Sequence, residues 1–98
     1  MSILTIEYIT SSDITTQSRL VSLIFAGECL RVLKQKRLIE SGLAVGTIKG
    51  SALFDQLRAE GFTVKDELMK IAFIKLGVKE DDVEYVVSLS KQFVLRGN

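Results

Sequence analysis

The sequence predicts a mainly α protein, a compact bundle of about four helices, and leaves room for a short β-strand at the N-terminus. Three observations support this. Apolar residues recur at helical spacing along most of the chain, glycines punctuate those stretches, and the 98 residues contain no proline. A chain of this length holds one hydrophobic core, so we assign residues 1–98 to a single helical domain.

The first half of the chain is expected to hold the strand and the longest helix. The β-branched and aromatic run Ile3–Ile9 is typical of a short strand. Ser11, Ser12 and Asp13 supply oxygen acceptors for a helix start, and the helical pattern then runs from about residue 14 to residue 40, ending at Gly42. Residues 43–50 contain two glycines and are either a second short strand, paired with the first, or a loop.

Three shorter helices are predicted in the second half. Residues 51–60 form a helix that Gly61 ends. Thr63 is placed to cap the next helix, which ends at Gly77. The last helix runs from about residue 79 to residue 95, with acidic residues in its first turn and basic residues at its end, as the helix dipole favours.

The last helix has the most regular apolar pattern. One predicted buried stripe consists of Val83, Val86, Val87, Ser90, Phe93 and Val94. Tyr85 and Leu89 form a second stripe, so this helix is expected to contact neighbours on two sides. The phenylalanines are spaced about one per helix, and all five, including Phe93, are predicted to lie in the core.

The long helix changes its apolar side at Gly27. Leu20, Val21, Leu23, Ile24 and Phe25 centre on one side, whereas Cys29, Leu30, Val32 and Leu33 centre on nearly the opposite side. Either the helix breaks or kinks at Gly27, or it stays straight and buries one half in its own core and the other half against a partner. The second explanation makes an interface of Leu20, Leu23, Ile24, Cys29, Leu30 and Leu33.

Two charged clusters are candidate contact sites. The basic cluster consists of Arg31, Lys34, Lys36 and Arg37, and the acidic cluster consists of Glu80, Asp81, Asp82 and Glu84. The basic cluster is explained most simply as a solvated helix surface, and the acidic cluster by its favourable interaction with the helix dipole. Alternatively, the two clusters pair with each other, within the fold or across subunits. Contact of the basic cluster with phosphates is a third interpretation.

The segment Ile71–Val83 has the outline of a helix-turn-helix, in which the second helix reads base edges in the major groove. Its spacing is one residue longer than usual, and its second helix opens with the acidic cluster. Carboxylates in that position oppose the charge of a phosphate backbone. We therefore interpret the segment as an ordinary helical hairpin with a glycine turn.

The absence of certain residues limits the chemistry. The sequence has no histidine and one cysteine, which excludes Ser–His and Cys–His nucleophiles, histidine-based zinc sites and internal disulfides. We predict no catalytic residues, no metal and no cofactor. The first residues do not resemble a signal peptide, and no apolar run approaches the length of a membrane span, so we expect a cytoplasmic protein that does not bind membranes.

Three classes of function remain. A mean hydropathy of +0.28 is high for so short and charged a chain, which favours a homodimer or larger assembly. The leading hypothesis is a small non-enzymatic regulator or adaptor that binds itself and another protein. The alternative is a nucleic-acid-binding transcriptional regulator with a degenerate helix-turn-helix, although the net charge of +1 gives little attraction to nucleic acid. A histidine-free enzyme or ligand-binding protein is the third class.

Overall fold

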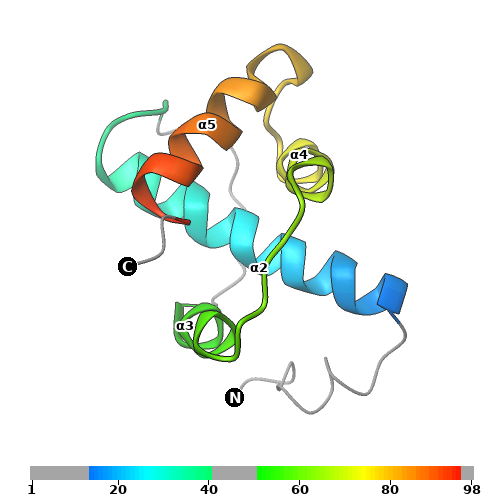
Figure 1. Cartoon of the computed structure of the whole chain (residues 1–98). Helices are drawn as coiled ribbons and strands as arrows, with labels where there is room; N and C mark the ends of the chain where they lie inside the picture. Colours follow the sequence, from blue (N-terminus) through cyan, green and yellow to red (C-terminus); the bar gives the residue numbers. More distant parts are fainter. Residues whose placement is uncertain (1–13, 41–50, 96–98) are drawn as a thin grey trace.

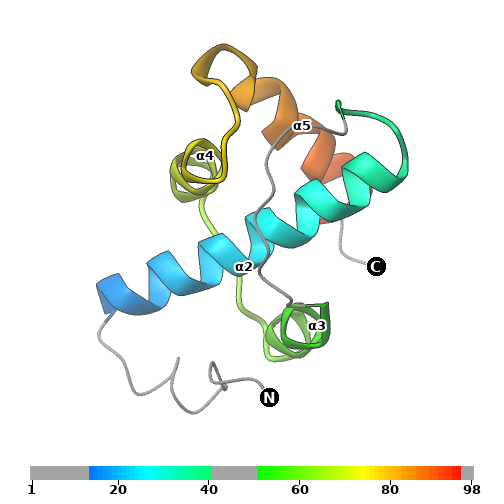
Figure 2. The same cartoon turned by 180° about the vertical axis from the view of Figure 1, so that it is seen from behind.

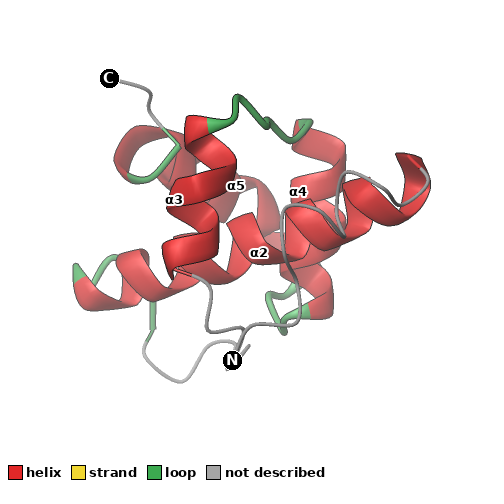
Figure 3. Ribbon diagram, turned by 90° about the horizontal axis from the view of Figure 1, so that it is seen from below, coloured by secondary structure: helices red, strands yellow, loops and turns green. Residues whose placement is uncertain are grey.

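The computed structural model describes residues 14–40 and 51–95, and this part of the chain is built from helices and loops (Figure 3). Its elements are α2 (Ile14–Gln35), α3 (Ser51–Ala59), α4 (Asp66–Lys75), a 3₁₀ turn η1 (Glu80–Asp82) and α5 (Val83–Phe93) (Figure 1). The prediction of a mainly α bundle of four helices is confirmed. The predicted strand Ile3–Ile9 and residues 43–50 lie outside the described residues.

The long helix α2 is the centre of the fold. Opposite views show α3 on one side of α2, and α4 and α5 on the other (Figures 1 and 2). The helix continues without a break through Gly27, and every residue from 24 to 30 is buried. A helix buried on all sides needs apolar residues all round. The change of apolar side at Gly27 therefore reflects burial between two layers, and not a break in the helix, which was one of the two explanations considered.

This arrangement also corrects the interface expected on α2. Ile24, Cys29, Leu30 and Leu33 are buried in the protein's own core, and Leu20 and Leu23 are half-buried. The reason is geometric, because α3 covers one side of the helix while α4 and α5 cover the other. One chain thus supplies both layers, and no partner is needed to cover the second apolar side of α2.

Specific side-chain contacts join α2 to its neighbours. The rings of Phe25 and Phe54 pack edge to face across α2 and α3, with centroids 4.9 Å apart and an interplanar angle of 67°. On the other side, the fully buried Cys29 thiol of α2 interacts with Ser90 of α5. The Ser90 hydroxyl also donates a hydrogen bond of 2.8 Å to the carbonyl of Val86. The small Ser90 side chain thus allows α5 to approach α2 without an unpaired polar group in the core.

Three helices end with the same backbone motif. A residue in the left-handed region follows the last turn in each case, namely Arg37 (φ 59°), Gly61 (φ 85°) and Gly77 (φ 108°). The next amide donates to the carbonyl five residues earlier, as seen in the pairs Leu38–Leu33, Phe62–Leu57 and Val78–Phe73. The expected ends at Gly61 and Gly77 are confirmed. Helix α2, however, ends at Gln35 rather than near residue 40, because Arg37 takes the position that glycine usually occupies.

Two ion pairs join helices α4 and α5. Lys91 near the end of α5 contacts Asp66 at the start of α4 at 2.6 Å, and Lys70 lies 3.6 Å from Glu84 at the start of α5. Helix α4 begins after Lys65, whose carbonyl accepts from the amide of Met69. The expected cap at Thr63 is therefore wrong, since the chain is still extended at Lys65.

Candidate functional site

Four large apolar side chains are exposed on α4 and α5. The exposed fractions are 53% for Ile71, 42% for Ile74, 61% for Tyr85 and 45% for Phe93. Single exposed apolar residues are ordinary, but Ile71 and Ile74 are neighbours at i and i+3 on one helix. They form the continuous apolar patch from which we build the candidate site.

This patch lies on the side of α4 that faces away from the core. Met69, Ala72 and Phe73 are buried on the inner side, toward α2 and α5. Glu67, Ile71, Ile74 and Lys75 are exposed on the opposite side, and we call these four residues the α4 outer face. Acidic Glu67 lies in the first turn of the helix and basic Lys75 in the last, with the two isoleucines between them. This arrangement, an apolar centre with charged residues around it, is the one found in protein–protein contact surfaces.

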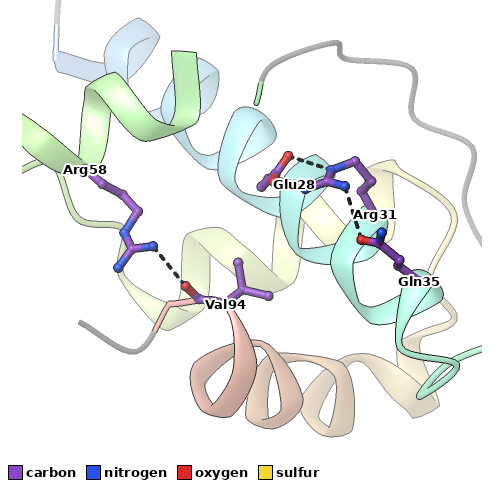
Figure 4. Close-up of polar contacts among 5 residues, drawn as sticks. All are labelled: Glu28, Arg31, Gln35, Arg58 and Val94. Carbon is purple, nitrogen blue, oxygen red and sulfur yellow. Dashed lines mark hydrogen bonds and ion pairs between the residues drawn. The ribbon is translucent and has the colours of Figure 1, made fainter. Parts of the chain in front are cut away.

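The basic cluster is not gathered into a single positively charged surface. Arg31 donates to the carboxylate of Glu28, through Nε at 3.1 Å and through Nη2, and to Gln35 at 3.4 Å (Figure 4). Glu28 is largely buried, so this ion pair holds the Arg31 guanidinium against its own helix. The half-buried Lys34 lies one turn further along α2.

The rest of the basic cluster lies close to α5. The Lys36 ammonium lies 5.7 Å from the centroid of the Phe93 ring, a cation–π contact that partly covers this aromatic side chain. Arg37 lines a hollow of about 600 Å³ between the end of α2 and the start of α5. Leu38, Ile39 and Tyr85 also line this hollow.

The acidic cluster surrounds the start of α5, and all four of its members are exposed. Glu80, Asp81 and Asp82 form η1, and Glu84 follows in the first turn of α5. Asp82 lines the same hollow as Arg37, whereas Glu84 pairs with Lys70 of α4. The structure thus brings one member of each cluster to a shared hollow, and directs another acidic residue toward α4.

A larger hollow of about 690 Å³ opens between α3, α4 and the end of α5. Phe25, Phe62 and Leu95 contribute apolar surface to it, and its charged residues are Asp55, Arg58, Asp66 and Lys91. Asp66 and Lys91 pair with each other. Arg58 donates to the carbonyl of Val94 at 3.3 Å (Figure 4) and lies 5.5 Å from the Phe54 ring. Asp66 and Lys91 thus join α4 to α5, and Arg58 joins α3 to the residue that follows α5.

The single cysteine is part of the core. Burial raises the pKa of the Cys29 thiol from 9.0 to about 12, while Ser90 opposes this effect and the charge of Glu28 adds to it. A thiol with so high a pKa is a poor nucleophile at neutral pH. This agrees with the packing role that the sequence suggests for Cys29.

Neither a metal site nor a membrane span is found within residues 14–40 and 51–95. Within these ranges, no group of three or more acidic or cysteine side chains is arranged to hold a metal ion. None of the described helices is both long and apolar enough to cross a membrane. No family model matches the chain, and comparisons with curated proteins and with solved structures found no significant match.

The α4 outer face was not anticipated from the sequence, although a signal for it exists. Residues 71–74 are four consecutive apolar residues, Ile-Ala-Phe-Ile. On a helix, four successive residues cannot share one face, because each is rotated by about 100° from the last. Ala72 and Phe73 follow the buried stripe, so Ile71 and Ile74 are left on the opposite side.

Proposed function

We propose that this protein is a small non-enzymatic regulator or adaptor that acts through protein–protein contacts, as a homo-oligomer. One observation carries the proposal, namely the exposed pair of isoleucines on the α4 outer face. The two adjacent apolar side chains have an acidic residue at one end and a basic residue at the other. They suit a partner surface that also has an apolar centre and charged ends.

Two further features support a role in binding rather than catalysis. The Cys29 thiol, with its raised pKa, is inside the core. In the larger hollow, Asp66 and Lys91 pair with each other, and Arg58 contacts α5. We place the protein in the cytoplasm because Cys29 is a free thiol.

A nucleic-acid-binding regulator is the second candidate, and the arrangement of α4 and α5 favours it. The two helices are joined by the short connection at Gly77. In Figure 1, α4 is seen end-on whereas α5 lies across the view, so the two helices cross. Crossed helices of this kind occur in helix-turn-helix proteins. The acidic cluster, however, occupies the end of α5 that would read bases, and its carboxylates repel phosphates.

The test is affinity capture with the tagged full chain from extract of its own host, after nuclease treatment. We expect a protein partner that wild type and the Ser88→Ala control retain, and that the Ile71→Ser/Ile74→Ser variant loses. Ser88 is also exposed but lies on α5, outside the α4 outer face. Circular dichroism confirms that the variants remain folded.

Binding to duplex DNA, followed by fluorescence anisotropy at about 0.15 M salt, separates the two candidates. If the protein acts mainly through protein–protein contacts, we expect no saturable binding to duplex DNA. Saturable binding that is lost on reversing Lys34 and Arg37 to glutamate, together with the absence of any nuclease-resistant partner, would support the nucleic-acid candidate and contradict our proposal.

A further inference from the structure

We propose that the α4 outer face is a self-association surface, on which α4 of a second copy of this chain packs antiparallel to the first. This inference rests on the proposed function, because it names the first partner of the same face. Its apolar centre comes from Ile71 and Ile74, both of which are exposed. Two copies packed together remove both side chains of each copy from water, which favours association.

The charges on this face indicate the direction of packing. Glu67 and Lys75 each lie four residues from Ile71, so they are about 12 Å apart along the axis at 1.5 Å per residue. A two-fold axis through Ile71 places Glu67 of each copy opposite Lys75 of the partner subunit. Parallel packing instead places like charges together. Antiparallel packing also opposes the two helix dipoles.

These two charges are available for such contacts. Neither Glu67 nor Lys75 has an ion-pair partner among the residues that the structure describes. The neighbouring charges of α4 are engaged with α5, since Asp66 pairs with Lys91 and Lys70 with Glu84. The contacts within the chain therefore lie on the flank toward α5 and leave the outer face open.

The exposed aromatic side chains of α5, Tyr85 and Phe93, fit a second copy less well. Phe93 is partly covered by Lys36, and Tyr85 lies at a hollow whose charged residues come from the segments that follow α2 and precede α5. The α4 outer face, by contrast, has two adjacent exposed isoleucines and a charge pattern that matches itself when reversed. One ten-residue helix per copy makes a small interface, so we expect a dimer that forms and dissociates with concentration.

Sedimentation velocity of the full chain over a range of concentrations tests the proposal. We expect wild type to shift from monomer to dimer as concentration rises. Glu67→Lys alone and Lys75→Glu alone each reverse two contacts per dimer, so each is expected to weaken dimerisation by about tenfold. Tyr85→Ser is the control and is expected to dimerise as wild type does.

The decisive step is an equimolar mixture of Glu67→Lys and Lys75→Glu. In an antiparallel pair, every contact between these two variants again joins a lysine and a glutamate. The mixture is therefore expected to dimerise as strongly as wild type, although neither variant does so alone. Both positions are exposed, and circular dichroism checks that the variants fold.

Three results would overturn the inference: a wild-type chain that remains monomeric at every concentration, single variants that dimerise as wild type does, or a mixture that stays monomeric. The first of them would also contradict the homo-oligomeric part of the proposed function, but none of them decides whether the protein binds another protein. Capture of a nuclease-resistant partner that depends on Ile71 and Ile74 would still support a protein-binding role.

Discussion

Phe25 of α2 and Phe54 of α3 pack edge to face, with their ring centroids 4.9 Å apart. This contact attaches α3 to the opposite side of α2 from α4 and α5. Leu57, one turn further along α3, is also fully buried. The long helix is therefore held between two layers, and the α4 outer face remains as an apolar surface directed away from both.

Truncating Phe54 should destabilise the fold far more than truncating Phe93. Phe54→Ala leaves a cavity in the core and is expected to lower the free energy of unfolding by about 3–5 kcal/mol. Phe93 is nearly half exposed, so Phe93→Ala is expected to cost about 1 kcal/mol, including its contact with Lys36. Urea denaturation of both variants measures the difference. Equal losses would contradict the exposed position of Phe93.

Replacing Arg37 with glycine should stabilise the protein. Arg37 adopts a φ of 59° after the end of α2, a conformation that glycine tolerates better than arginine. We expect Arg37→Gly to raise the free energy of unfolding by about 0.5–1 kcal/mol. Thermal and urea denaturation provide the measurement.

Gly61→Ala is the matched control for this prediction. Gly61 has a φ of 85°, and an added Cβ meets nothing within 4 Å. Its replacement therefore tests the backbone alone and is expected to destabilise the protein by about 1 kcal/mol. If Arg37→Gly instead lowers the free energy of unfolding, the contacts of the Arg37 side chain stabilise the fold by more than its positive φ destabilises it.

The buried Cys29 thiol should make the fold sensitive to alkaline pH. Because burial raises its pKa from 9.0 to about 12, the folded protein keeps a proton that the unfolded chain loses in this range. The contribution of this group is fully present below pH 9 and decreases as pH rises toward 12, by about 1.4 kcal/mol per pH unit. Lysines and tyrosines also titrate here, so the comparison is with Cys29→Ala.

Unfolding free energies of wild type and Cys29→Ala at pH 8, 9.5 and 10.5 isolate this effect. Wild type is expected to be the more stable of the two at pH 8, and its advantage is expected to shrink as pH rises. A difference that stays constant with pH would show that the thiol titrates equally in the folded and unfolded chain.

Much of the fold could be predicted from local signals. Gly61 and Gly77 mark the ends of α3 and α4 because glycine readily adopts a positive φ. The end of α2 could not be predicted in this way, since Arg37 takes the same conformation without the glycine that signals it. The start of α4 was also misplaced, because Thr63 has the chemistry of a cap but lies in a chain that is still extended at Lys65.

The candidate site was harder to predict, because periodicity shows which residues are apolar but not which neighbour covers them. The opposite apolar sides of α2 suggested a partner, whereas α3, α4 and α5 of the same chain cover both. Phe93 fits the spacing of the buried stripe but lies at its edge, beneath Lys36. The Arg31–Glu28 pair joins residues three apart on one helix, a spacing that the sequence shows although we did not predict the pair, while the Lys70–Glu84 pair depends on the tertiary fold.

The most direct test of the central claim is a dilution series of the isotope-labelled full chain, followed by amide NMR. If the protein acts through contacts on the α4 outer face, amide signals of residues 67–75 should shift with concentration, while those around Tyr85 and Arg31 stay constant. Spectra that do not change with concentration, or shifts confined to residues 31–37 and 80–84, would contradict the account.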